Sequence, residues 1–154
     1  MLTPKRNTKK SNNGVITSNR KKTAQSIRPT SRQNQNGTQS THVMEWGGGE
    51  GKGRSKYAVN PTIFPNKDGS WTDLGQSEDR MASYKEAKKR DEVFGFRSAK
   101  KAEKFAAGSW KKGEDRKEAM KNYRSDKKQG LLYTQSKDFK QVKKTAKKKW
   151  KTQD

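Results

Sequence analysis

The stretch that decides the fold is EVFGFRSAKKAEKFAAGSW, residues 92–110. Its first five residues, Glu92–Phe96, are mostly aromatic or β-branched and predict a strand. Ser98 follows at the position of a helix N-cap, where its hydroxyl can accept a hydrogen bond from the first turn. The apolar residues after Ser98 recur at helical spacing and predict a helix with one apolar face: Ala102, Phe105, Ala106 and Trp110.

Upstream of this stretch the sequence predicts two strands, a turn and a helix. Residues 42–46 alternate between apolar and polar side chains, and residues 56–64 are rich in β-formers. Pro61 lacks a backbone donor and therefore indicates a sheet edge or bulge. Pro65–Gly69 is typical of a turn. Residues 77–90 predict a helix, because acidic residues occur in the first turn and basic residues in the last.

Composition divides the chain into three parts. Residues 42–112 hold nine of the thirteen aromatic residues and are expected to form a small α+β module of order β-β-α-β-α. Residues 1–41 contain nine basic and no acidic residues. They have few aliphatic side chains to offset roughly 1–2 kcal/mol of backbone entropy per ordered residue, which predicts a disordered basic arm. Residues 113–154 predict a basic, partly helical tail.

The composition of the whole chain excludes several classes of protein. The net charge is +22, and Leu, Ile, Val and Phe together make up 17 of 154 residues, whereas globular proteins contain roughly 20% or more of these types. The absence of cysteine excludes disulfides and thiolate metal sites. No apolar run approaches the roughly 18 residues of a membrane span, and the N-terminus shows no secretion signal.

The middle of the chain resembles a small module that recurs in virion proteins of tailed bacteriophages, including internal core proteins and injected peptidoglycan-degrading proteins. The resemblance rests on an ordered series of segments: Tyr57–Phe64 with Pro61-Thr62, Asp68-Gly69-Ser70-Trp71, Glu86–Arg90, Glu92–Phe96 followed by Ser98, and Ala102–Trp110. The resemblance implies a virion component. It does not imply an enzymatic role, because no catalytic domain accompanies the module.

Two features suggest small-molecule or metal chemistry, and both have simpler interpretations. Gly47–Gly53 resembles a phosphate-binding loop but lacks the Gly-Lys-Ser/Thr order, so a hairpin turn or linker is expected. His42 is the only histidine, and without cysteine it cannot complete a zinc site of usual composition. We therefore expect no cofactor, no metal and no small-molecule substrate.

The acidic pairs and two tryptophans are likewise expected to be structural. Glu78-Asp79 and Asp91-Glu92 are flanked by arginines and are interpreted as helix-terminal or surface charges rather than as a catalytic pair. Trp71 and Trp110 could stack on bases, but so small a module needs its large side chains in the core. The protein is therefore expected not to be an enzyme.

The basic residues carry the functional prediction. In the arm, polar residues separate them, which suits contact with a phosphate backbone without reading bases. In the tail they cover most of a helix whose narrow apolar stripe runs through residues 137–151. The predicted nucleic-acid-binding residues are Lys5, Arg6, Lys9, Lys10, Arg20, Lys21, Lys22, Arg28, Arg32, Lys143, Lys144, Lys147, Lys148, Lys149 and Lys151.

These observations predict a non-enzymatic structural protein of a tailed-phage virion, present in the host cytoplasm before assembly. Its expected partners are nucleic acid, most simply double-stranded DNA bound without sequence preference, and other virion proteins. Two alternatives stay open. One is a cellular basic nucleic-acid-binding or ribosome-associated protein. The other is a membrane-active basic helix at residues 137–151, although its lysines are not confined to one face and do not favour membrane contact.

Overall fold

The computed structural model describes residues 14–27, 32–33, 39–40, 44–49, 51–75, 77–79 and 81–141. It has a mixed α+β fold, so the predicted fold class is confirmed. The chain forms two compact units, Met1–Lys111 and Lys112–Asp154.

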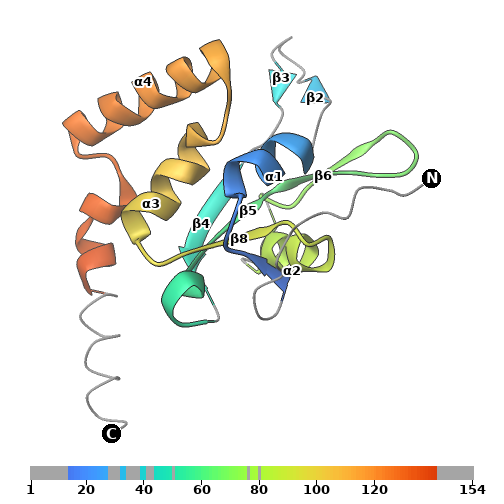
Figure 1. Cartoon of the computed structure of the whole chain (residues 1–154), viewed down its shortest axis with the longest axis horizontal. Coiled ribbons are helices and arrows are strands. Elements are labelled where there is room, and N and C mark those ends of the chain that lie inside the picture. Colours follow the sequence, from blue (N-terminus) through green and yellow to red (C-terminus); the bar gives the residue numbers. More distant parts are fainter. Residues whose placement is uncertain are drawn as a thin grey trace, which may run out of the picture. The chain divides into compact units, whose positions relative to one another are not determined.

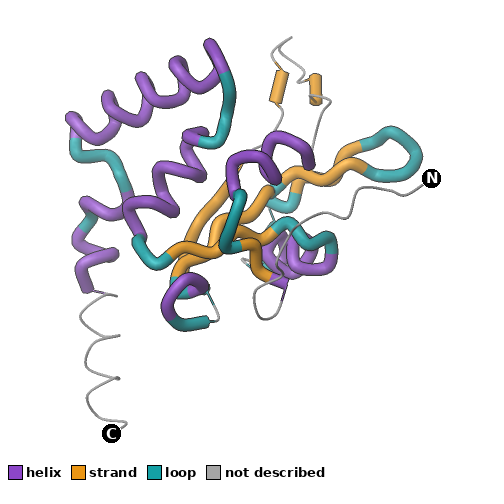
Figure 2. The backbone as a smooth tube through the Cα atoms, in the orientation of Figure 1, coloured by secondary structure: helices purple, strands orange, loops and turns teal. Residues whose placement is uncertain are grey.

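The first unit is built on a four-stranded sheet of order β1-β8-β5-β4 (Figures 1 and 2). Its strands are β1 (Val15–Ile16), β8 (Val93–Phe96), β5 (Tyr57–Pro61) and β4 (Met44–Gly48). Strand β8 pairs in parallel with β1 and antiparallel with β5, which in turn pairs antiparallel with β4. All four residues of β8 are buried, so this strand needs cover on both faces.

Helices supply that cover, α1 and α3 on one face and α2 on the other (Figure 1). The helices are α1 (Arg20–Ile27), α2 (Ala82–Lys89) and α3 (Ala99–Lys104). Because successive strand residues point to opposite faces, the sheet contributes to two separate clusters. One contains Ala24, Val59, Phe94, Phe96, Ala102, Phe105 and Trp110. The other contains Val15, Ala58, Phe64, Tyr84, Ala87 and Val93.

Residues 14–27 correct the predicted boundary of the disordered arm. They form β1 and α1, which belong to the core of the first unit, with Ala24 fully buried and Val15 8% exposed. Averaged over residues 1–41, the composition is too polar to predict a folded segment. The few apolar residues of this short segment, however, pack against the sheet. Strands β2 (Arg32–Gln33) and β3 (Gln39–Ser40), also from the predicted arm, pair antiparallel with each other.

The predicted strand over residues 56–64 is two strands with a bend at Thr62. The second of them, β6 (Ile63–Pro65), forms a hairpin with β7 (Trp71–Asp73), which the sequence did not predict. The turn expected at residues 65–69 connects them. Trp71, expected in the core, is only half-buried, because β7 belongs to this hairpin and not to the main sheet.

The remaining predicted elements of the module are present, but the helix predicted over residues 77–90 is shorter: α2 begins at Ala82, and its first turn contains no acidic residue. Ser98 is the N-cap of α3, and its side chain accepts a hydrogen bond from Lys101 N. Beyond Lys104 the helix widens into a π-turn over Phe105–Ser109, where Gly108 has a φ of 118°, a conformation that favours glycine. Phe105 and Trp110 are 3% and 5% exposed, which confirms that they are core residues.

The second unit contains α4 (Gly113–Gln129), the helix predicted over residues 114–128. Gly130 ends it in the left-handed conformation, with Gly130 N and Leu131 N donating to Lys127 O and Asp126 O. A single 3-10 turn follows at Tyr133–Gln135, and residues 137–141 are helical. The rest of the helix predicted over residues 137–151 lies outside the described residues.

Candidate nucleic-acid interface

The structure describes the side chains of three of the fifteen predicted nucleic-acid-binding residues. Arg20, Lys21 and Lys22 form the first turn of α1. Arg32 is the first residue of β2, where only the backbone is described. The other eleven lie outside the described residues: Lys5, Arg6, Lys9, Lys10, Arg28, Lys143, Lys144, Lys147, Lys148, Lys149 and Lys151.

Arg20 has a structural role that the sequence did not reveal. Its Nε donates a hydrogen bond to Gly95 O at 2.7 Å, and its guanidinium lies 4.4 Å from the centre of the Phe96 ring. Burial, and secondarily the positive charge of Arg54, lowers the pKa of Arg20 from its usual value. The side chain therefore joins the start of α1 to the central strand, and its Nε is not available to a phosphate.

Lys21 and Lys22, by contrast, are exposed on α1, whose first turn contains no acidic residue. Cations at a helix N-terminus are unfavourable, because the helix dipole places partial positive charge there. A nearby polyanion would remove this unfavourable interaction.

Sequence reasoning missed a second group of cations on α3. Lys100, Lys101 and Lys104 are exposed, whereas Ala102 and Glu103 between them are buried. The sequence contained a signal for these lysines. The helix was predicted to bury one apolar face, so the positions on its other side must face solvent.

The exposed lysines of α1 and α3 belong to one helical layer of the first unit. Both helices cover the same face of the sheet, and Gln25 Nε2 of α1 donates to Trp110 O at 2.6 Å, just beyond the π-turn that follows α3. Among the residues that the structure describes, none of these lysines takes part in an ion pair. We call the following residues the basic layer: Lys21, Lys22, Lys100, Lys101 and Lys104.

Several acidic residues of the first unit face inward or contact other residues of the fold. Glu92 and Glu103 are 7% and 6% exposed. The burial of Glu92 corrects its assignment as a surface charge, since it directly precedes the buried strand β8. Glu45 accepts hydrogen bonds from Ser83 Oγ and, at 3.3 Å, from Asn60 Nδ2. Among the described residues, none of these carboxylates forms an ion pair with a lysine of the basic layer, although Glu103 lies on α3 between Lys101 and Lys104.

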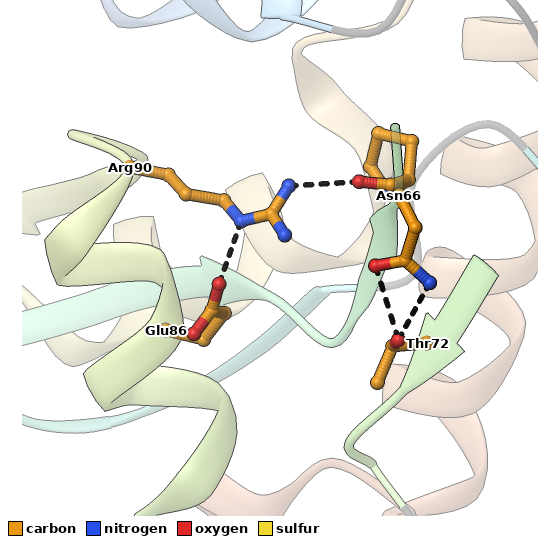
Figure 3. A network of polar contacts seen from close by, with 5 residues as sticks. Asn66, Thr72, Glu86 and Arg90 are labelled. Carbon is orange, nitrogen blue, oxygen red and sulfur yellow. Dashed lines mark hydrogen bonds and ion pairs between the residues drawn. The ribbon is translucent and has the colours of Figure 1, made fainter. Parts of the chain in front are cut away.

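A second polar network fixes α2 to the β6–β7 hairpin (Figure 3). Arg90 Nε donates to Glu86 Oε1 at 2.9 Å, and Arg90 Nη1 donates to Pro65 O at 3.0 Å. Asn66 Nδ2 donates to Thr72 Oγ1 at 2.9 Å within the hairpin. Every one of these contacts joins parts of the fold to each other, so the network is interpreted as structural.

The other candidate sites have structural roles where they are described. In the Gly47–Gly53 run, Gly47 and Gly48 end β4 and Gly49 N donates to Lys56 O at 2.8 Å between β4 and β5, as expected of a hairpin connection. Asp79 Oδ1 accepts from Met81 N at 2.9 Å at the start of α2, a helix-terminal role as predicted. Asp91 is exposed, and His42 lies outside the described residues.

Three further findings bear on function. No group of three or more potential metal ligands occurs among the residues that the structure describes. Within the same residues, no helix is long and apolar enough to cross a membrane. No protein-family model, curated protein or solved structure matches the chain.

Proposed function

We propose that this protein is a non-enzymatic structural component of a tailed-phage virion that contacts packaged double-stranded DNA through exposed basic residues and docks on other virion proteins. The observation that carries the DNA contact is the basic layer: five exposed lysines on α1 and α3, none of which forms an ion pair with another described residue. The virion assignment comes from the resemblance of residues 57–110 to the phage module.

The physical basis of the proposal is counterion release. DNA condenses counterions along its phosphates, and a lysine that neutralises a phosphate releases them. Such binding needs exposed cations and no base-reading geometry, so it is independent of sequence. Isolated surface lysines are also typical of solvated faces. What favours DNA contact here is a layer of one sign on a chain whose net charge is +22.

Binding of the full chain to two duplexes of unrelated sequence, measured by fluorescence anisotropy from 50 to 300 mM salt, tests the DNA contact. We expect equal affinities and a steep salt dependence. Replacing the five basic-layer lysines with Gln should reduce the slope of log K against log salt by up to about 4.5, at roughly 0.9 per phosphate contact.

A control variant with the same change in charge replaces five lysines elsewhere in the first unit with Gln: Lys52, Lys56, Lys67, Lys85 and Lys89. We expect this variant to keep most of the wild-type slope. Equal losses in the two variants would show that the layer has no special role, and salt-insensitive binding would contradict the mechanism.

Mass spectrometry of purified phage particles tests the virion assignment separately. We expect the chain among the particle proteins. Its absence from particles, combined with retained DNA binding, would favour the cellular nucleic-acid-binding alternative.

A further inference from the structure

Helix α4 carries a stripe of basic residues along one side. Lys117, Lys121, Arg124 and Lys128 follow one another at spacings of four, three and four residues, and all four are exposed. At 3.6 residues per turn, these spacings keep the four side chains within a narrow arc of the helix surface. We call these four residues the α4 stripe.

The acidic residues of α4 are placed away from most of this stripe. Glu114 pairs with Lys117 at 3.2 Å at the start of the helix, where both side chains are highly exposed. Asp115, Glu118 and Asp126 lie outside the arc of the stripe by their helical positions, and Glu118 is nearest to it, three residues before Lys121. In the described part of the chain, no ion pair involves Lys121, Arg124 or Lys128.

The like charges within the stripe do not favour the helix itself. Lys117–Lys121 and Arg124–Lys128 are like-charge pairs at i,i+4, a spacing at which like charges destabilise a helix. The favourable order, an acidic residue four positions before a basic one, does not occur in α4: the positions four after Glu114, Asp115, Glu118 and Asp126 hold Glu118, Ala119, Asn122 and Gly130. The acidic first turn (Glu114, Asp115) and the basic last turn (Lys127, Lys128) suit the helix dipole, but the i,i+4 pairs within the stripe do not stabilise α4.

We infer that the α4 stripe binds the phosphate backbone of double-stranded nucleic acid without sequence preference. This inference rests on the proposed function and names a second contact surface for it. The stripe extends over eleven residue steps, or roughly 16 Å at about 1.5 Å per residue. The phosphates of one strand follow one another at about 3.4 Å along the duplex axis while they wind around it, so a stripe of this length can face several phosphates at once.

An acidic protein surface is the competing partner, and the composition of the stripe favours nucleic acid. Protein interfaces are centred on apolar and aromatic residues, and charged residues are depleted there. The stripe has no apolar member, and the apolar residues Met120 and Tyr123 fall outside its arc. Contacts made only by cations are instead typical of phosphate-backbone binding.

The test uses the full chain and the variant Lys117→Gln, Lys121→Gln, Arg124→Gln and Lys128→Gln. Its charge-matched control is Lys52→Gln, Lys67→Gln, Lys85→Gln and Lys89→Gln. Anisotropy titrations with a 20-bp duplex from 50 to 300 mM salt give the slope of log K against log salt. We expect the stripe variant to lose up to about 3.6 from the slope, at roughly 0.9 per contact, and the control to lose less than about 1.

Three further measurements separate the effect of charge from an effect on folding, and binding to DNA from binding to an acidic protein surface. Far-UV circular dichroism should show nearly unchanged helix content in the stripe variant, because the loss of two like-charge pairs offsets the loss of the Glu114–Lys117 pair. A second variant, Lys117→Arg, Lys121→Arg and Lys128→Arg, should bind the duplex as the wild type does. Competition by poly-glutamate of matched charge should be much weaker than competition by unlabelled duplex.

The outcomes distinguish this inference from the proposed function. If the wild-type chain does not bind duplex DNA, the proposed function fails and the inference fails with it. If the wild type binds but the stripe and control variants have equal slopes, only the inference is overturned. If poly-glutamate competes as well as the duplex does, the partner of the stripe is an acidic protein surface and the inference is likewise wrong.

Discussion

Replacing Gly95 with Ala should destabilise the first unit, because the central strand has no room for a β-carbon there. A Cβ built at Gly95 would lie 2.6 Å from Arg54 O and 2.7 Å from Val15 Cγ1. The first neighbour is backbone and cannot turn aside, and the second belongs to the paired strand β1. Overpacking of this kind costs about 1–3 kcal/mol of unfolding free energy.

Thermal unfolding followed by near-UV circular dichroism measures the effect. A domain of this size loses roughly 4–8 °C in Tm per kcal/mol, so we expect Gly95→Ala to unfold about 5–20 °C below the wild type. The matched control is Gly47→Ala on strand β4, where a Cβ would meet nothing within 4 Å. That variant should stay within about 0.5 kcal/mol of the wild type or be slightly more stable.

A double-mutant cycle identifies the clash that is responsible. Val15→Ala removes the Cγ1 atom that the new methyl would meet, so the double variant Val15→Ala, Gly95→Ala should lose less stability than the sum of the two single variants. Additive losses would mean that β1 does not lie against Gly95. Equal stability of Gly95→Ala and Gly47→Ala would refute the close packing of the central strand altogether.

Two other predictions concern the core and the β6–β7 turn. The ring centre of Phe105 lies 5.1 Å from those of both Phe94 and Phe96. Phe105→Ala should therefore lower the free energy of unfolding, measured by chemical denaturation, by about 3–5 kcal/mol. A folded variant of near wild-type stability would contradict this packing role. Hydrogen bonds from Ser70 Oγ and Ser70 N lower the pKa of Asp68. The contribution of the Asp68 carboxylate to hairpin stability is therefore complete above the ordinary aspartate pKa of about 3.9, and it is lost as the pH falls through the lowered pKa of the folded state. NMR titration should find Asp68 below that ordinary value, and Asp68→Asn should remove this acid dependence; titration at or above the ordinary value would show that the turn contacts are absent in solution.

Local signals in the sequence predicted much of the module. Ser98 marks the start of α3, Gly130 follows the end of α4, and the aromatic residues Phe94, Phe96 and Phe105 meet in one cluster. These predictions succeed because caps, turns and apolar periodicity depend on neighbours a few positions away. These local signals predict the elements of the fold. They locate the basic layer only indirectly, because they define the apolar face of α3 and so leave its lysines exposed.

The long-range features could not be predicted in the same way. Nothing near Val15 indicates that it pairs with Val93, because parallel pairing joins segments far apart in the sequence. The role of Arg20 depends on the same distant contact, through Gly95 O and the Phe96 ring. Asp91-Glu92 was interpreted as a helix-terminal or surface pair because Arg90 flanks it, whereas the buried strand that follows places Glu92 inside the fold.

The place of β1 and α1 in the core decides how the basic N-terminal segment can be tested. Deleting residues 1–41 would remove nine basic residues, but it would also remove the edge strand beside β8 and the helix that buries Ala24. Loss of DNA binding in that deletion would then report unfolding as readily as lost charge. Replacing Lys5, Arg6, Lys9 and Lys10 with Gln changes the charge before β1 and leaves residues 14–27 intact. Substitution rather than truncation therefore separates the electrostatic contribution of this segment from its contribution to the fold.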